Sequence, residues 1–260
     1  MKTDLSLVTA LTWIVGSMLI IPGGVYKSYH LLNQASFFIE HPICRIIQTT
    51  SQQERLSTSY LAYLMNISAD KPAKAKYFDT RLAKKQLLTS PLIKEAYVQL
   101  IKPDTLYIDY AVRHPVAWIE DYENMAVDEE RTLFPITPFF SPKKLPRILL
   151  DLNLCEAKWG ARITSYRLEL ALQCLKTLES LSVNVHKIDV SKAEYASLGQ
   201  REIIVTLEEE KRERILRLTP KDFAKEIGNY LELRPNLTLT DHVIDLRIPK
   251  LAFIDSLEPS

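Results

Sequence analysis

The stretch KEAYVQLIKPDTLYIDYAV, residues 94–112, alternates apolar and polar side chains on either side of a Pro103–Asp104 pair. Alternation of this kind is typical of strands that bury one face, and Pro-Asp is a common turn dipeptide. The stretch therefore predicts a β-hairpin with one face in a core. The side chains expected on the buried face are Ala96, Val98, Leu100, Leu106, Ile108 and Tyr110.

The residues before this hairpin predict one strand and two helices. Phe37–Thr50 contains isoleucines in a pattern typical of a strand, and Ser57 is a suitable N-cap for a helix that follows it. Thr80–Thr89 predicts a second helix, which Pro91 ends. We expect this helix to turn inward the side chains of Leu82, Leu87 and Leu88. The order is β-α-α-β-β.

Residues 5–26, LSLVTALTWIVGSMLIIPGGVY, contain no charged side chain. About 20 apolar residues are enough for a helix to cross a bilayer, so we expect an uncleaved membrane anchor. A cleaved signal peptide and a buried core helix are the alternatives. Lys2 is the only basic side chain before the run, and no small-x-small cleavage site follows it. The charges flanking the run do not decide its orientation, but a large domain can cross regardless, and we expect the N-terminus inside.

The composition excludes several classes of protein. The chain has 33 Lys and Arg residues and 32 Asp and Glu residues, so its net charge is too small to attract nucleic acid. Three widely spaced cysteines, Cys44, Cys155 and Cys174, form neither a disulfide framework nor a zinc motif. A single Cys155–Cys174 bridge and three free, buried thiols remain alternatives.

Residues 118–254 predict a mixed β domain with two helices. A leucine stripe over 164–181 is typical of a helix face in a core, and 220–231 predicts a helix with Phe223 and Ile227 inward. The charge run Glu208–Glu213 is expected to be a solvated turn between two strands. Strands are expected at 185–190, 202–207 and 214–218, and the leucine stripe consists of Leu168, Leu172, Leu175 and Leu178.

Three consecutive segments carry a resemblance to a known family: SPLIKEAYV at 90–98, KPDTLYIDY at 102–110 and RHPVA at 113–117. Together with the preceding strand and helices, they resemble the POTRA domain of the FtsQ/DivIB division proteins. Val112 stands where that family has a glutamate. Any polar role that the glutamate has in the family is therefore not expected here, whereas the fold is. The matching residues are Pro103, Thr105, Leu106, Ile108, Arg113, Pro115 and Ala117.

The resemblance continues through the second half of the chain. Trp118–Phe134 is similar to the family's hairpin with a central aspartate, here Asp128. Arg131 stands where the family has a turn glycine, so we expect the turn to be built differently. LPRI at 145–148 matches the family's Leu-Pro element, and IDLR at 244–247 is the most specific motif in the chain.

This resemblance implies an α+β fold with a single anchor and two extracytoplasmic domains. The expected division is a cytoplasmic tail at 1–4, a transmembrane helix at 5–26, a connector at 27–36, a POTRA domain at 37–117, a β domain at 118–254 and a tail at 255–260. It also implies a scaffold of the bacterial divisome in the inner membrane, enriched at the septum. Its partners would be FtsB-like and FtsL-like proteins, with other division proteins recruited through the POTRA domain.

The sequence offers little for chemistry. The five histidines are far apart and have no metal-ligand spacing, and no nucleophile elbow or phosphate-binding glycine loop occurs. We therefore expect no enzymatic activity, cofactor, metal or small-molecule substrate. Asp245 and Arg247 could be read as a catalytic pair, but two residues apart on a strand they are better interpreted as a structural charge pair.

The last apolar segment, IPKLAFI at 248–254, is the candidate binding site. Pro249 lacks an N–H group, which suits an edge strand, and a partner segment could add a further strand there. Alternatively these side chains simply fill the core. The predicted contact residues are Ile248, Lys250, Leu251, Ala252, Phe253 and Ile254.

Two other functions stay open. The first is another POTRA-type envelope protein that chaperones client strands, which would usually carry repeated POTRA domains. The second is an anchored envelope hydrolase, which would need a catalytic cluster assembled by the fold.

Overall fold

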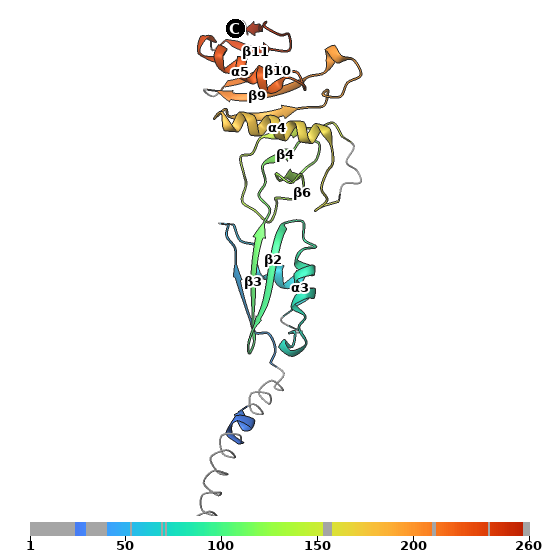
Figure 1. The fold of residues 1–260 in the computed structure, drawn as a ribbon, viewed down its shortest axis with the longest axis vertical. Coiled ribbons are helices and arrows are strands. Elements are labelled where there is room, and N and C mark those ends of the chain that lie inside the picture. The colour runs from blue at the N-terminus through green and yellow to red at the C-terminus, as the bar shows by residue number, and fades with distance from the viewer. Residues whose placement is uncertain are drawn as a thin grey trace, which may run out of the picture.

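The computed structural model describes residues 24–29 and 41–256, apart from 53, 69, 71, 153–157, 210, 211 and 239. The fold is α+β, as predicted, with one sheet of three strands and one of nine. Figure 1 shows the two sheets in succession along an elongated molecule, with helical residues 24–29 beyond the smaller one. The predicted anchor at 5–26 lies almost wholly outside the described residues. Among those described, no helix is long and apolar enough to cross a membrane.

The smaller sheet follows the predicted element order, β-α-α-β-β. Its strands lie in the order β1-β3-β2, with β1 parallel and β2 antiparallel to the central β3. A short 3-10 turn, η1, lies between the helices. The elements are β1 (Arg45–Thr49), α2 (Thr58–Leu64), η1 (Ala75–Tyr77), α3 (Thr80–Leu87), β2 (Ile93–Ile101) and β3 (Thr105–Val112). We call residues 41–112 the three-stranded unit.

Side-chain caps begin both helices of this unit. The Ser57 hydroxyl accepts a hydrogen bond from the Tyr60 N–H at 3.2 Å, as the sequence predicts for an N-cap. The carboxylate of Asp79 accepts from two N–H groups of the first turn of α3, at 2.8 and 3.1 Å. Both caps satisfy amide groups that a helix start leaves without an intrahelical partner.

The inward face of α3 differs from the prediction. Leu87 is fully buried, but Leu82 and Leu88 are 53% and 41% exposed. Ala83 is the residue that joins Leu87 in the core. Residues four apart share a helix face, whereas each single step turns the side chain by about 100°. A short helix that contacts the sheet along one narrow stripe therefore buries Ala83 and Leu87 alone.

The hairpin buries the predicted face. Ala96, Val98, Leu106, Ile108 and Tyr110 are buried and Leu100 is half-buried, while Tyr97 and Ile101 point to solvent. The core they form extends to Ala126 and Phe134 of the second sheet and to Ile136, which follows its last strand. The two sheets are thus joined through packed side chains as well as through the chain.

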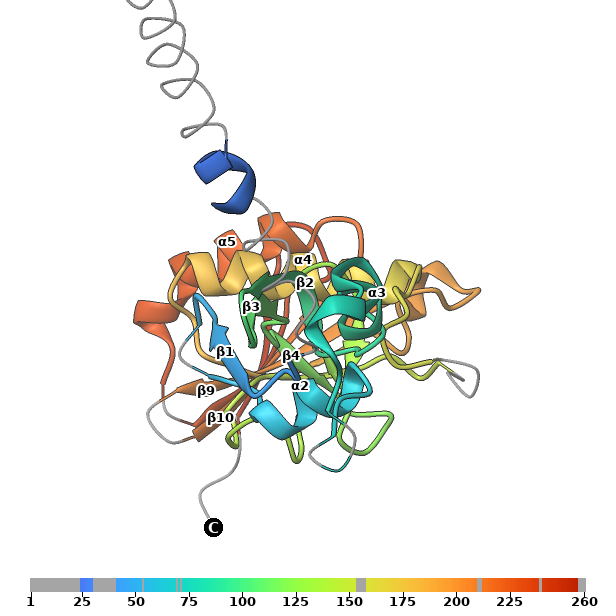
Figure 2. The same ribbon diagram turned by 90° about the horizontal axis from the view of Figure 1, so that it is seen from below.

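The larger sheet has the order β12-β11-β10-β9-β8-β7-β4-β5-β6. Helices α4 (Tyr166–Ser180) and α5 (Phe223–Leu233) lie on the same side of it (Figure 2). The strands are β4 (Ala117–Ile119), β5 (Ala126–Val127), β6 (Leu133–Phe134), β7 (Arg147–Leu149), β8 (Val185–Asp189), β9 (Ile203–Glu209), β10 (Arg212–Leu218), β11 (Asp241–Asp245) and β12 (Phe253–Ser256), with short 3-10 turns η2 (Leu198–Gln200) and η3 (Arg234–Asn236).

The leucine stripe of α4 is core, as predicted. Leu168, Leu175 and Leu178 are buried, and Leu172 packs against the same cluster. Cys174 lies in this stripe as a fully buried free thiol. As a free thiol, Cys174 does not form the Cys155–Cys174 bridge that was one alternative, although Cys155 itself lies outside the described residues. The other alternative, three buried thiols, is wrong for Cys44, which is exposed. Burial raises the pKa of Cys174 to about 12.

We expect the two described cysteines to react at very different rates with a thiol reagent. Cys44 is exposed, whereas Cys174 is enclosed and almost never ionised at pH 8. In a Cys155→Ser chain, one thiol should react in the native state and a second only in denaturant. Native labelling of two thiols would contradict this packing of α4.

The turn before β6 also differs from the prediction. Arg131 replaces the expected glycine, yet its φ is +67°, so the backbone keeps the left-handed conformation that favours glycine. The Asp128 carboxylate holds the turn by accepting from the Thr132 N–H at 2.8 Å and from Arg113 at 2.7 Å. Arg131 in turn donates to Glu169 of α4 at 2.9 Å.

The prediction of a solvated turn at 208–213 is only partly right: Glu208, Arg212 and Glu213 are exposed, but they lie in strands, and Glu209 is mostly buried. Strand β9 continues to Glu209, and β10 begins at Arg212. Only 14% of the Glu209 side chain is exposed, and it accepts hydrogen bonds from Arg214 and from the Tyr230 hydroxyl. The antiparallel pairing of β9 with β10 continues into the charged run, which brings Glu209 close to the end of α5.

Candidate partner interface

Strand β12 forms one edge of the nine-stranded sheet. It pairs antiparallel with β11, with Ile254 opposite Ile244 and Phe253 opposite Asp245. All four residues of β12 are exposed, and no other described strand pairs with its outer side. A strand in this position presents backbone N–H and C=O groups that another extended segment can bind.

A row of buried side chains runs across the sheet and ends at this edge. The pairing aligns Ile254 with Ile244, Leu216 and the strands beyond them. The interior members are completely buried beneath α4 and α5, whereas Ile254 is 45% exposed. The row consists of Ile119, Ile148, Ile188, Val205, Leu216, Ile244 and Ile254. An apolar side chain of an added strand would extend it by one position.

The segment before β12 is a turn and not the strand that the sequence suggested. The Leu251 N–H donates to the Ile248 carbonyl at 3.1 Å, with Pro249 and Lys250 between them. Lys250 has a φ of +67°, and proline followed by a left-handed residue is the pattern of a type II turn. Proline supports the turn because its φ is already close to the required value.

Most of the predicted contact residues lie on the surface. Ile248, Leu251 and Phe253 are 48%, 57% and 56% exposed, and Lys250 also faces solvent. Ala252 is the exception, because it is partly buried against the core of the large sheet. The alternative that the segment fills the core therefore holds for Ala252 alone. Several large apolar side chains exposed close together are typical of an interaction surface.

A groove of about 530 Å³ lies between α5 and the turn that leads into β12. Asn229 and Leu233 line it from the helix, and Leu246, Leu251 and Ala252 line it from the C-terminal segment. The sequence analysis did not identify the helix residues. Asn229 and Leu233 are four residues apart and lie on the face of α5 away from Ile227. This spacing is the sequence signal that could have identified them.

Glu226 forms part of the groove wall and is a buried acid. Its carboxylate accepts hydrogen bonds from the N–H and the hydroxyl of Thr219, at 2.6 and 2.7 Å. Burial raises the pKa of Glu226 despite these bonds. The contacts fix the start of α5 against the end of β10, and so fix one side of the groove.

Asp245 and Arg247 hold the C-terminal segment in place. The Arg247 guanidinium donates two hydrogen bonds to the Asp245 carboxylate, at 2.9 and 2.7 Å, as the structural interpretation of the IDLR motif predicts. Arg247 also lies 3.2 Å from Glu202, which is 3% exposed. The motif thus ties the residues before β12 to the beginning of β9.

Glu202 is the centre of this ion cluster. Arg217 donates to it at 2.9 and 2.6 Å, and Lys192 at 3.1 Å. Burial opposes ionisation of Glu202, but these hydrogen bonds and the nearby charge of Arg247 outweigh it and lower its pKa. A similar balance lowers the pKa of Asp245.

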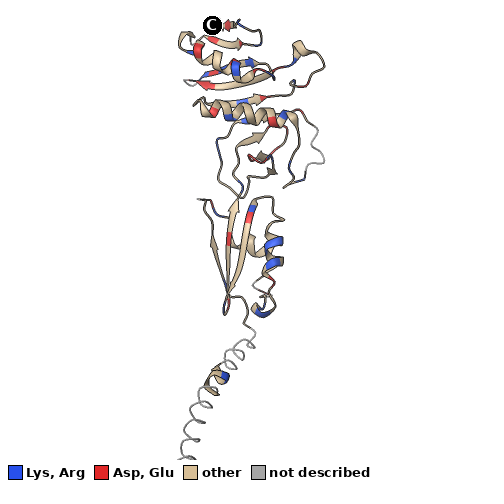
Figure 3. Ribbon diagram, in the orientation of Figure 1, with Lys and Arg blue, Asp and Glu red and all other residues tan. Residues whose placement is uncertain are grey.

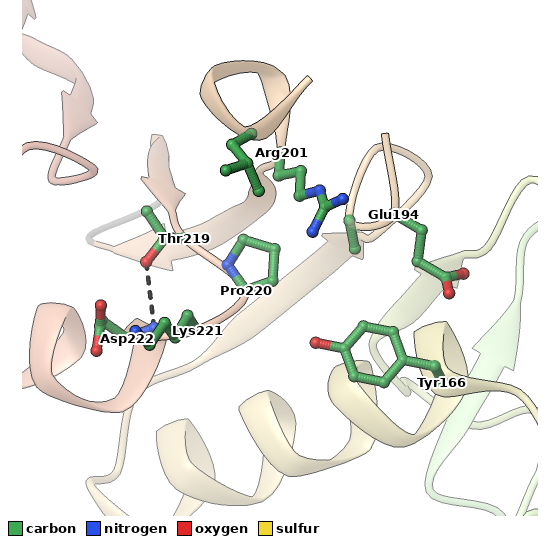
Figure 4. Close-up of a pocket in the computed structure, with 9 residues that line it drawn as sticks. Tyr166, Glu194, Arg201, Thr219, Pro220, Lys221 and Asp222 are labelled. Carbon is green, nitrogen blue, oxygen red and sulfur yellow. Dashed lines mark hydrogen bonds between the residues drawn. The ribbon is translucent and has the colours of Figure 1, made fainter. Parts of the chain in front are cut away.

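A second pocket, of about 650 Å³, lies beside the start of α4 (Figure 4). Tyr166, Pro220 and Lys221 line it, with Glu194 and Arg201 at its rim. Both rim residues are engaged, because Arg167 donates to Glu194 at 3.1 Å and Arg201 donates to the Tyr195 carbonyl at 2.6 Å. Within the described part of the chain, no three or more His, Cys, Asp or Glu side chains gather as metal ligands would.

Comparison of the sequence with protein-family models and with curated proteins found no match.

Proposed function

We propose that this protein is a single-pass scaffold of the bacterial division machinery, held in the inner membrane by residues 5–26. It would bind FtsB-like and FtsL-like partners and link early division proteins to septal peptidoglycan synthesis. The proposal begins from the resemblance to the FtsQ/DivIB proteins. The β-α-α-β-β order of residues 41–112 is compatible with a POTRA domain. In this proposal, that domain recruits other division proteins.

One observation carries the binding part of the proposal: β12, the last described strand, is an exposed edge strand with apolar side chains. A partner strand beside β12 would gain main-chain hydrogen bonds along its whole length. Ile254 and Phe253 point to opposite faces of the sheet, because successive residues of a strand alternate. The partner strand should therefore place an apolar residue beside Ile254, where it extends the buried row.

The groove beside α5 supports a longer contact. It adjoins the turn at 248–251 and offers apolar contacts at Leu233 and Leu251, with polar groups between them. A partner that continues past its strand could lie there. Main-chain pairing would then supply affinity, and the groove would supply specificity.

We expect Phe253→Glu or Ile254→Glu to weaken binding of the partner by at least tenfold. Burying a carboxylate at the centre of an interface is costly, and aromatic side chains at such positions often contribute about 2 kcal/mol or more, roughly thirtyfold in affinity. The measurement is capture of the extracytoplasmic segments of an FtsB/FtsL-like pair by the full chain in detergent.

Tyr63→Glu is the matched control, because Tyr63 is 75% exposed and lies on α2 in the other unit. The control should bind as the unchanged chain does. If all three variants bind equally, β12 is not the interface. If the unchanged, folded chain does not bind at all, the divisome assignment fails, and capture of unfolded envelope proteins would favour the chaperone alternative.

A further inference from the structure

Asp255 is the charged residue of β12 and so lies on the candidate partner edge. Its side chain is exposed, and among the described residues the carboxylate has no hydrogen-bond or ion-pair partner. Figure 3 marks an acidic residue in β12, beside the C-terminal label. Asp245 and Glu202, by contrast, are paired with arginine side chains. Asp255 is therefore a charge at the interface that the fold itself does not neutralise.

The backbone of the edge directs the hydrogen-bonding groups of Ile254 outward. Just after β11, the Leu246 N–H donates to the Arg217 carbonyl of β10 at 3.0 Å. Ile244, two residues earlier, also directs its N–H and C=O groups toward β10, because these groups alternate between the two sides of a strand. Its pairing partner in β12 is Ile254, which therefore forms no ladder hydrogen bond with β11. The N–H and C=O of Ile254 are left for an added strand.

A partner strand that bonds to Ile254 places one of its next side chains beside Asp255. Asp255 and Phe253 lie on the face of the sheet away from α4 and α5, opposite to Ile254. On that face, Asp255 is aligned with Val243 and Ile215, which are both partly buried. An added strand would thus enclose the carboxylate between an apolar side chain and a side chain of the partner.

The described charges on this face do not neutralise Asp255. Arg217 is already paired with Glu202 at 2.6 Å and with Asp245 at 3.4 Å. Glu213 is a further exposed acid on the same face. A carboxylate that loses water without gaining a partner costs free energy, and a second acid directly opposite would add repulsion. Only a cationic side chain of the partner removes both costs.

We propose that the partner segment that adds to β12 carries a lysine or arginine beside Asp255, next to an apolar residue beside Ile254. This inference deepens the proposed function and rests on β12 being its partner interface. The apolar residue extends the buried row, and the cation neutralises the edge. Segments with an acid at the second position are rejected, so the edge selects its partner by repulsion as well as by attraction.

Selection from a random peptide library tests this preference without knowledge of the partner. The full chain in detergent, unchanged or with Asp255→Lys, would be exposed to displayed peptides of about ten residues, the length of a long strand. Peptides count only if Ile254→Glu abolishes their binding, because that change disrupts the edge. We expect Lys or Arg next to an apolar residue in peptides that bind the unchanged chain. Asp or Glu should replace the cation in peptides that bind Asp255→Lys.

The affinity of one selected lysine peptide, measured by fluorescence anisotropy, gives the size of the effect. Asp255→Asn should weaken binding about two- to fivefold, and Asp255→Lys about fivefold or more, because repulsion then replaces the lost attraction. Exchanging the peptide's lysine for glutamate should restore binding to Asp255→Lys. Asp70→Lys makes the same charge change at an exposed residue of the three-stranded unit and should leave the affinity unchanged. Equal affinity for all of these chains would overturn the proposal.

Failure of the proposed function would look different. If the peptides show the cation but the chain captures no FtsB/FtsL-like pair, the divisome assignment fails and the preference of the edge stands. If peptides without a charge preference bind and depend on Ile254, the cation rule is wrong and the interface stands. If no peptide depends on Ile254, both the rule and the assignment of β12 as an interface are refuted.

Discussion

Replacing Glu209 with alanine is expected to lower the free energy of unfolding by about 3 kcal/mol. The carboxylate accepts hydrogen bonds from Arg214 and from the Tyr230 hydroxyl at 2.8 Å, and it forms an ion pair with Arg234 at 2.9 Å. Arg214 is 11% exposed and Tyr230 is fully buried, so both would lose a partner that water cannot easily replace. Urea unfolding followed by circular dichroism measures the change.

The neighbouring residue provides the control. Glu208 is exposed and its carboxylate has one long contact, 3.4 Å from the Asn184 amide. Glu208→Ala should change the unfolding free energy by less than about 0.5 kcal/mol. Similar small effects at both positions would mean that the whole charge run is solvated, as its sequence alone suggests, and that the contacts of Glu209 do not form.

Replacing Glu202 with glutamine is expected to cost about 2–3 kcal/mol of unfolding free energy at pH 7. The substitution keeps the shape of the side chain but leaves Arg217, Arg247 and Lys192 around a neutral group. Arg217 is 35% and Lys192 48% exposed, so solvent screens part of the repulsion and the cost stays below that of a fully buried pair. Arg247 retains Asp245, which preserves the turn before β12.

The pH dependence of this difference tests the electrostatic cause. The pKa of Glu202 is lower in the folded chain than its usual value. An acid of this kind stabilises the fold above its unfolded pKa, about 4.3, and the contribution is lost as the pH falls through the lower, folded value. The difference between the unchanged chain and Glu202→Gln should therefore shrink below about pH 4.3. A constant difference down to the acid transition would indicate lost packing instead.

Lys192→Gln is the companion control. Lys192 donates to the same carboxylate but is half exposed, so its removal should cost less than about 1 kcal/mol. A cost equal to that of Glu202→Gln would mean that each ion pair contributes separately and that no shared buried charge exists.

Local patterns predicted the elements of this protein well. Alternation identified the hairpin at 94–112 and its inward face, because strand side chains alternate strictly between two environments. The leucine stripe of α4 and the N-cap at Ser57 were also predicted correctly, because both depend on residues within one or two helical turns. The prediction failed for Leu82 and Leu88, whose burial depends on how wide a contact α3 makes with the sheet.

The C-terminal site was predicted in part. The segment 248–254 was recognised from its apolar composition, but its division into a turn and a short strand depends on where β12 pairs with β11. The groove residues of α5 and the partners of Glu209 were missed, because they are distant in sequence and meet only in the folded sheet.

The sequence by itself determined the α+β class, the order of the helices and strands and the structural pairing of Asp245 with Arg247, since each depends on neighbours along the chain. The tertiary structure alone decided that β12 is an edge, that Ile254 ends a buried row, and that Glu202 and Glu209 are centres of ion clusters. These are properties of pairing between strands far apart in sequence, whose register is set by the packing of the whole sheet against α4 and α5.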